Sequence, residues 1–202
     1  MRVALIGASG NAGSRILAEL ARRGHEVTAI VRNPERVPAL DKVRAVKGDV
    51  YDREALAGIV RGHDAVVSSV HFTASDPHAL IEAVRRSGVR RYLVVGGAGS
   101  LESSPGVRLI DGPGFPEAYK AEATAGAAFL DILRSENELD WTFISPSAEF
   151  VPGERTGRFR LGGDALLVGE HGSRVSFEDF ALALVDELER PEHSRRRFTV
   201  GY

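Results

Sequence analysis

The stretch Val3-Ala4-Leu5-Ile6-Gly7-Ala8-Ser9-Gly10-Asn11-Ala12-Gly13 decides the fold. Its first four residues form a short apolar run, as expected of a buried strand. The glycine-rich turn that follows opens a helical pattern with Ile16, Leu17 and Leu20 on one side, and Gly24 can end that helix. We therefore predict a strand, a tight turn and a helix that packs back on the strand.

The same alternation continues along the chain. Further apolar runs occupy residues 27–31, 43–46, 65–67, 92–95 and 141–144, and helical patterns separate most of them. Strands joined through helices need crossover connections, so they pair in parallel, and apolar strands are covered on both faces. We predict an α/β fold: a Rossmann-like, doubly wound, mainly parallel sheet with helices on both faces, in a single domain.

The later helices and the C-terminal part extend this prediction. The helix expected at 116–135 carries a stripe of Ala118, Ala121, Ala125, Phe129, Ile132 and Leu133. A capping box at Ser176-Phe177-Glu178-Asp179 starts a last helix, in which we expect these core residues: Phe177, Phe180, Ala181, Leu184, Val185 and Leu188. Residues 198–200 are expected as a strand at the sheet edge. We predict one NAD(P)-binding domain over 1–202, with a small substrate-side excursion at about 146–175, in which 158–175 forms a hairpin or loop.

Composition excludes several classes of function. The 202 residues carry a formal net charge of −2, so we expect no nucleic-acid partner. Cysteine is absent, which excludes disulfides, thiolate catalysis and Cys-based zinc sites, and we predict no metal site. The first strand begins at Arg2 and no apolar run approaches the roughly 20 residues that span a bilayer. We expect a soluble, cytoplasmic protein without a membrane partner.

The glycine turn has the chemistry of a dinucleotide site. Gly7 allows the tight turn, Gly10 lets the backbone approach a pyrophosphate, and Gly13 lets the helix pack closely on the strand. The exposed amides at the helix start then receive the phosphates, because the helix dipole favours negative charge there. The predicted contacts are Gly7, Ser9, Gly10, Asn11, Ala12 and Gly13. The alternative is a structural turn without a ligand.

Arg32 favours the phosphorylated dinucleotide. NAD-preferring sites usually place Asp or Glu at the end of the second strand, about 20 residues beyond the glycines. Here that position is Arg32, whose guanidinium can hold a 2′-phosphate with two hydrogen bonds. We therefore predict NADP(H) as the preferred cofactor, with Arg36 as a helper and NAD(H) as the alternative. Arg32 could instead be a solvent-facing loop residue.

Several segments together carry a family resemblance. They are Gly7-x-x-Gly10-x-x-Gly13, Val31-Arg32-Asn33-Pro34, Gly48-Asp49-Val50, Gly96-Gly97-Ala98-Gly99-Ser100, Tyr119-Lys120-Ala121-Glu122-Ala123, Ile144-Ser145-Pro146-Ser147 and the tail segments 152–157 and 197–202. The chain resembles the atypical short-chain dehydrogenase/reductases of the NAD(P)H-binding, NmrA-like group, and within it the bacterial proteins described as NADH-flavin reductases. The resemblance covers essentially the whole chain. Its glycine motif is common to a large superfamily, whereas the later segments are more specific.

The resemblance implies further cofactor contacts. Asp49 and Val50 would line the adenine pocket, although Asp49 could instead cap the next turn. The backbone of Ser69 and Val70 would run beside the cofactor, although Ser69 could equally be a plain strand end. Gly96 and Gly97 would lie at the ligand-binding rim of the sheet, and Ser145 and Pro146 would border the nicotinamide.

The catalytic residues follow less directly. Typical members of the superfamily use a Tyr-x-x-x-Lys pair, whereas here Tyr119 and Lys120 are adjacent, about 100° apart around a helix. Lys120 holds the nicotinamide ribose if the resemblance applies, and otherwise is a surface lysine. Tyr119 is a candidate proton donor, and His71 with Phe72 a candidate wall of the nicotinamide pocket. No Ser/His/Asp pattern competes with them.

These observations predict an NADPH-dependent oxidoreductase that transfers hydride to a flavin-like or quinone-like acceptor, with FMN or FAD as a substrate. Such an acceptor takes hydride directly, so the protein needs mainly to align the rings while solvent supplies the proton. The alternative is a non-catalytic, NmrA-like redox sensor that binds NADP(H). A nucleotide-sugar epimerase or dehydratase fits less well, because the Tyr-Lys pair and a large substrate domain are absent. Monomer and homodimer both remain open.

Overall fold

A computed structural model describes residues 1–202, and its centre is an eight-stranded sheet in the order β10-β12-β8-β5-β4-β1-β2-β3. The strands are β1 (Arg2–Ile6), β2 (Glu26–Val31), β3 (Val43–Lys47), β4 (Ala65–Ser68), β5 (Arg91–Val95), β8 (Asp140–Pro146), β10 (Arg160–Gly162) and β12 (Arg196–Gly201). All neighbours pair in parallel except β10, which runs antiparallel to β12. The predicted fold class is therefore confirmed.

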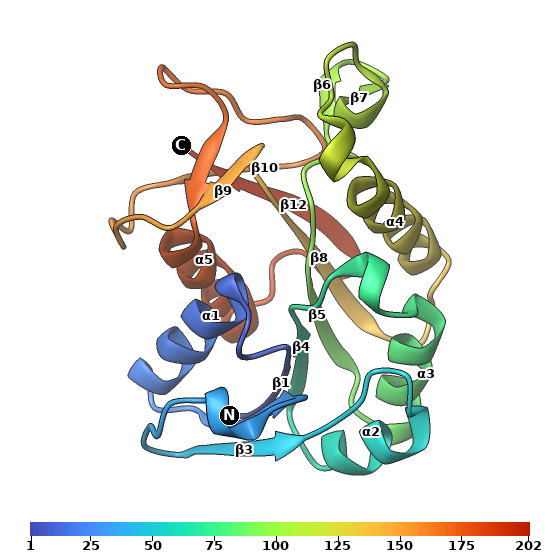
Figure 1. The fold of residues 1–202 in the computed structure, drawn as a ribbon, viewed down its shortest axis with the longest axis vertical. Coiled ribbons are helices and arrows are strands. Elements are labelled where there is room, and N and C mark those ends of the chain that lie inside the picture. The colour runs from blue at the N-terminus through green and yellow to red at the C-terminus, as the bar shows by residue number, and fades with distance from the viewer.

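Helices cover both faces of this sheet (Figure 1). On one face lie α1 (Asn11–Arg22) and α5 (Phe177–Glu189), and on the other lie α2 (Arg53–Val60), α3 (Pro77–Ser87) and α4 (Glu117–Arg134). Single turns of 3-10 helix occur at η1 (Pro34–Arg36), η2 (Phe72–Ala74) and η3 (Leu109–Asp111). None of these helices is long and apolar enough to cross a membrane.

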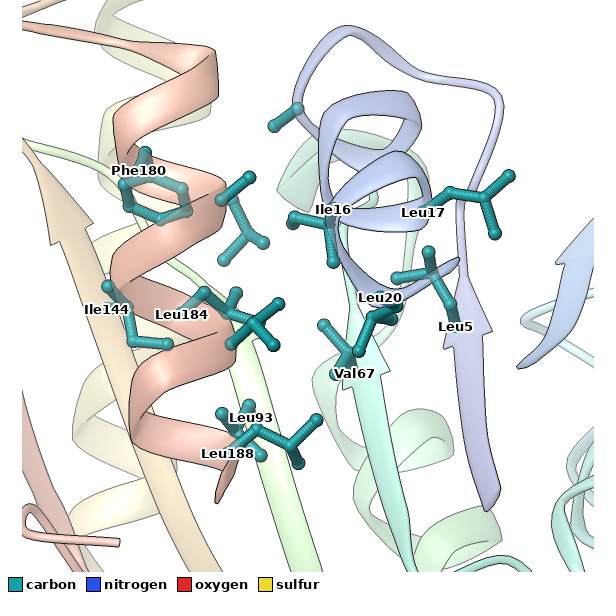
Figure 2. Packing of buried hydrophobic residues seen from close by; sticks show 14 of the residues in the cluster. Leu5, Ile16, Leu17, Leu20, Val67, Leu93, Ile144, Phe180, Leu184 and Leu188 are labelled. Atoms are coloured by element: carbon teal, nitrogen blue, oxygen red, sulfur yellow. The ribbon is translucent and has the colours of Figure 1, made fainter. Parts of the chain in front are cut away.

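The two faces of the sheet bury separate apolar cores of 25 and 20 residues. Figure 2 shows the first, where Ile16 and Leu20 of α1 and Leu184 of α5 pack over the strands. Strand residues alternate between the cores, as a pleated strand requires: Leu5 belongs to the first and Ile6 to the second. All the core residues that we predicted for the last helix are buried.

The predicted stripe on the long helix is wrong over its first turns. Ala118 and Ala121 are exposed, and the helix buries instead a face that begins at Gly126 and includes Phe129 and Leu133. An 18-residue helix is about 27 Å long, whereas the five residues of the neighbouring β5 span about 17 Å. The first turns of α4 therefore extend beyond the carboxyl end of β5 and overhang that end of the sheet.

The predicted edge position of the last strand is wrong. Residues 198–200 do lie in a strand, but β12 is not at the sheet edge, because β10 pairs outside it through Leu161 and Val200. Two small sheets lie above the main one in Figure 1. They consist of β9 (Glu149–Val151) with β11 (Arg174–Ser176), and of β6 (Glu102–Ser104) with β7 (Val107–Arg108).

Candidate dinucleotide-binding site

The glycine turn lies where the strand order reverses. β1 is flanked by β2 on one side and by β4 on the other, so the chain winds outward in both directions from it. Ligands of open α/β sheets bind at such a switch point, beyond the carboxyl ends of the strands. We call this end of the sheet the carboxyl edge, and the end where the parallel strands begin the amino edge.

Two of the three glycines are required by the fold itself. Gly7 has φ +83°, and a Cβ there would lie 2.1 Å from the carbonyl oxygen of Ser69. A Cβ on Gly13 would lie 2.1 Å from the carbonyl oxygen of Gly7. Gly10 differs, because its Cβ would meet only the Gly7 oxygen at 3.4 Å and the Ser69 oxygen at 3.9 Å. Internal packing does not require glycine at position 10, so close approach by a ligand explains it better.

The start of α1 offers unpaired donors beside Gly10. The Gly10 amide donates to Gly7 and the Ser14 amide to Gly10, but the amides of Asn11, Ala12 and Gly13 find no acceptor within the chain. Neither a capping side chain nor an acidic residue serves this first turn. Unpaired amides at the positive end of a 12-residue helix suit a pyrophosphate in both charge and hydrogen bonding. The residues present therefore fit a dinucleotide.

Arg32 and Arg36 lie beyond the end of β2, and both side chains are exposed. Neither forms an ion pair with a carboxylate, in contrast to Arg22 and Arg23 of α1, which both pair with Glu19. A cation without a partner at this position remains available to a 2′-phosphate.

The residues after β3 and β4 take local roles as well. Asp49 is exposed, and its carboxylate accepts the Tyr51 amide at 2.9 Å, so it does cap the next turn, while Val50 packs against the second core. The Ser69 amide donates to Ile6 at 2.8 Å, which holds Ser69 and the adjoining Val70 against the glycine turn. Their contacts with the cofactor stay predictions.

Some residues at the ends of β5 and β8 are needed for packing, whereas others have no such role. A Cβ on Gly96 would lie 2.3 Å from the Phe143 ring, so packing alone requires that glycine, whereas Gly97 has nothing nearer than Phe72 at 3.8 Å. Ser145 is completely buried, and its Oγ has no hydrogen-bond partner. The adjoining Pro146 is also buried. A buried hydroxyl without a partner is unusual in a folded protein and marks this strand end.

The overhanging start of α4 carries Tyr119 and Lys120. Lys120 pairs loosely with Glu117 at 3.7 Å, and its side chain is 55% exposed. Tyr119 is 67% exposed and lies one turn before Glu122, on the helix face that continues through Gly126 toward Phe72. Tyr119 therefore projects on the side of α4 that faces the carboxyl edge, whereas Lys120 is turned about 100° away.

Glu122 is a site residue that the sequence reasoning missed. Its carboxylate accepts the Phe72 amide at 2.7 Å, the Thr73 amide at 3.0 Å and the Thr73 hydroxyl at 2.7 Å. Burial alone would raise the pKa of Glu122, but these hydrogen bonds hold it below the usual range. Its place in the segment Tyr119-Lys120-Ala121-Glu122-Ala123 was the available signal, although no local pattern reveals a partner some 50 residues away.

His71 and Phe72 separate in the structure. The His71 side chain is 83% exposed, with Nδ1 3.3 Å from Glu122 Oε1. Phe72 packs inward, edge-on to Phe129 and stacked on Phe143 with ring centroids 5.7 and 6.1 Å apart. Of this pair, His71 alone presents its side chain at the carboxyl edge.

Two hollows of about 600 and 580 Å³ lie away from the carboxyl edge. One lies between α3 and α4, around Arg85 and Glu136, and the other lies at the amino edge, around Arg2 and Arg44. Neither is lined by a predicted cofactor contact, and at least half of the residues that line each are charged. The candidate site is therefore defined by its backbone donors at the carboxyl edge and not by either of these two hollows.

Known proteins resemble this chain over nearly its whole length. The chain is 42% identical to the uncharacterized protein YwnB of Bacillus subtilis, over 99% of this chain and 98% of that protein. A solved structure from Bacteroides thetaiotaomicron, described as a "putative epimerase", is 42% identical with a TM-score of 0.95, covering 100% of this chain and 96% of the other. One from Streptococcus pneumoniae, described as a "putative NADH-flavin reductase", is 39% identical with a TM-score of 0.86, covering 100% and 99%.

The family model described as NAD(P)H-binding matches residues 7–191, from the first glycine to the end of α5 and beyond. The predicted resemblance to the atypical short-chain dehydrogenase/reductases of the NmrA-like group is confirmed. The chain therefore belongs to the NAD(P)H-binding oxidoreductase family.

Proposed function

We propose that the protein is an NADPH-dependent reductase that passes hydride to a flavin-like or quinone-like acceptor. The observation that carries this proposal is the unpaired start of α1 beside Gly10, where three successive amides have no acceptor in the chain. A pyrophosphate supplies the missing acceptors, and the nicotinamide half then extends along the carboxyl edge toward β5 and β8.

The preference for NADPH rests on Arg32. Its exposed guanidinium follows β2 and has no carboxylate partner, and the neighbouring Arg36 adds a second cation. An exposed arginine gains more from a phosphate dianion than from a ribose hydroxyl, because charge-assisted hydrogen bonds are about twice as strong as neutral ones. NADH should therefore bind more weakly than NADPH.

The acceptor class follows from what lies beside the nicotinamide end. When bound, the reduced nicotinamide supplies a hydride, and the chain's own task is to align the acceptor ring and to exclude water. Tyr119 offers an exposed aromatic surface on the overhang of α4, and Lys120 can reach the ribose from the adjacent helix face. The description of the streptococcal relative agrees with a flavin-like acceptor.

A redox sensor that binds NADP(H) without turnover is the second candidate. It is favoured by the separation of Tyr119 and Lys120 onto different helix faces, because the usual acid pair cannot form. An epimerase, as the Bacteroides relative is described, fits less well, since that chemistry relies on the same pair.

Calorimetry and turnover separate these candidates. We expect NADPH to bind at least about tenfold more tightly than NADH, and Arg32→Ser to remove most of that difference with little effect on NADH, since one charge-assisted contact is lost. Arg196→Ser, an exposed arginine at the amino edge, is the matched control.

NADPH oxidation with FMN, FAD, quinones and biliverdin then tests turnover. Binding without any turnover would favour the sensor, and no binding of either dinucleotide would refute the proposal.

A further inference from the structure

Glu122 joins α4 to the segment that leaves β4. Its two carboxylate oxygens receive the Phe72 and Thr73 amides and the Thr73 hydroxyl, all at 3.0 Å or less. Below it, Phe72 fills the space over Gly126, where a Cβ would lie 2.8 Å from the ring. The 71–73 segment is therefore fixed to α4 by both hydrogen bonds and packing.

This attachment also orients His71. The ring lies with Nδ1 3.3 Å from Glu122 Oε1, while the side chain is otherwise 83% exposed. A carboxylate beside Nδ1 favours the tautomer that carries its proton there. Nε2, on the far side of the ring, is then free to exchange a proton with a bound molecule.

The pair lies beside the proposed path of the nicotinamide. The segment starts at Ser69, which contacts Gly7 of the glycine turn, and it ends under Glu122, one helical turn below Tyr119. Phe72 stacks on Phe143 of β8, two residues before Ser145. His71 is thus held at the carboxyl edge between the glycine turn and α4.

We propose that His71 is the proton donor for a quinone-like acceptor and that Glu122 is its positioning residue; this inference rests on the proposed function. Hydride leaves C4 of NADPH with its electron pair and forms an O–H bond at one quinone oxygen. The electron pair of the opposite carbonyl becomes a phenolate, which takes the Nε2 proton of the His71 imidazolium. The products are NADP⁺, hydroquinone and neutral His71, which solvent reprotonates. A flavin accepts hydride without needing this acid.

The difference between the two acceptors provides the test. We expect His71→Asn to lower kcat for a naphthoquinone about 100-fold while leaving FMN reduction within about twofold, since general acids contribute factors of this order. Glu122→Gln should lower kcat with the quinone about tenfold at nearly constant KM, and Glu122→Asp should restore part of it. His78→Asn on α3 and Asp131→Asn on α4 are the matched controls, since both side chains are exposed and lie outside this pair.

A second readout does not depend on turnover. Nitrogen NMR of the imidazole should show the Nδ1–H tautomer for His71 in the free protein, and Glu122→Gln should shift it while Asp131→Asn does not. Equal losses with quinone and FMN, or quinone turnover unchanged in His71→Asn, would overturn the inference while leaving the reductase proposal intact. Failure of the wild-type protein to bind NADPH in calorimetry would instead remove both.

Discussion

Two groups of polar residues at opposite ends of the sheet differ in how far they are paired within the chain. At the amino edge, buried Arg91 donates to buried Glu187 at 2.8 Å and to Thr142 at 2.7 Å. His193 Nδ1 donates to the Glu187 carboxylate at 2.7 Å, and the His193 amide donates to the same carboxylate at 3.0 Å. At the carboxyl edge, the amides at the start of α1, the Arg32 guanidinium and Ser145 Oγ have no partner in the chain.

This difference suggests that the paired group stabilises the fold and that the unpaired group binds a ligand. Most donors and acceptors around Glu187 are paired, although Arg91 Nε and Trp141 Nε1 at the same end of the sheet are buried without a partner. The Arg91–Glu187 network therefore contributes mainly to folding. The unpaired groups at the carboxyl edge form no hydrogen bonds within the chain and therefore add little to its stability, but they remain free to bind a ligand. We infer that mutation of the Arg91–Glu187 network lowers the stability of the fold, whereas mutation of the unpaired groups at the carboxyl edge lowers ligand affinity with little effect on stability.

The largest effect should come from Glu187→Ala. Removing this carboxylate leaves the buried Arg91 charge with only the more distant Asp140 at 3.6 Å, which should cost about 3–5 kcal/mol of unfolding free energy. Urea denaturation measures it. Glu82→Ala is the control, because that carboxylate pairs at the surface with Arg53 and Arg86 and should cost less than about 1 kcal/mol. Similar losses for both variants would contradict the contrast between the edges.

A methyl group on either of two glycines should separate folding from binding. Gly13→Ala brings a Cβ to within 2.1 Å of the Gly7 oxygen, and should cost on the order of 3 kcal/mol of stability. Gly10→Ala meets that oxygen at 3.4 Å, so the protein should fold normally while losing about tenfold or more in NADPH affinity. Denaturation and calorimetry on both variants provide the measurements. Unchanged NADPH binding in a folded Gly10→Ala protein would argue against a pyrophosphate at this turn.

Acid should weaken the paired carboxylates. Burial tends to raise the pKa values of Glu19 and Glu187, but hydrogen bonds from Arg22, Arg155 and His193 hold both below the ordinary value of 4.5. A lowered folded pKa adds stability that is fully present above the unfolded value and is lost as pH falls through the folded one. Tm should therefore fall by several degrees between about pH 5 and about pH 3.

The same titration with Glu19→Gln should give a shallower fall in Tm, because that carboxylate no longer titrates. Glu170→Gln, at an exposed position without an ion pair, should follow the wild-type curve. Parallel curves for all three proteins would show that acid lability arises elsewhere.

The smallest effect should be that of Ser145→Ala. Its hydroxyl is buried without a partner, so its removal should leave the unfolding free energy unchanged or raise it by up to about 1 kcal/mol. NADPH affinity should fall about threefold if the hydroxyl meets the nicotinamide. Thr142→Ala, whose hydroxyl donates to the His193 carbonyl at 2.8 Å, should lose stability instead. A destabilised Ser145→Ala protein with unchanged affinity would place Ser145 with the structural network.

Patterns in the sequence predicted the layers of the fold and indicated the glycine turn as the candidate site. The glycine turn, the alternation of apolar runs with helices and the position of Arg32 depend on neighbours within a few tens of residues, so they are visible without coordinates. The edge position of residues 198–200 was wrong, because Arg160-Leu161-Gly162 has no strand pattern and pairs with β12 only through the folded chain.

The glycine pattern at positions 7, 10 and 13, the helical pattern of α5 and the fold class could be read from the sequence alone, because each follows from local motif spacing or periodicity. The clash that a Cβ on Gly7 would make with Ser69 is visible only in the folded chain. Tertiary structure decided which groups remain unpaired. The attachment of residues 71–73 by Glu122 and the ion pair of Arg91 with Glu187 join segments at least 49 residues apart. The overhang of α4 depends on the relative lengths of a helix and its neighbouring strand. Such contacts have no local signature, since a side chain's partner is chosen by the packing of the whole sheet.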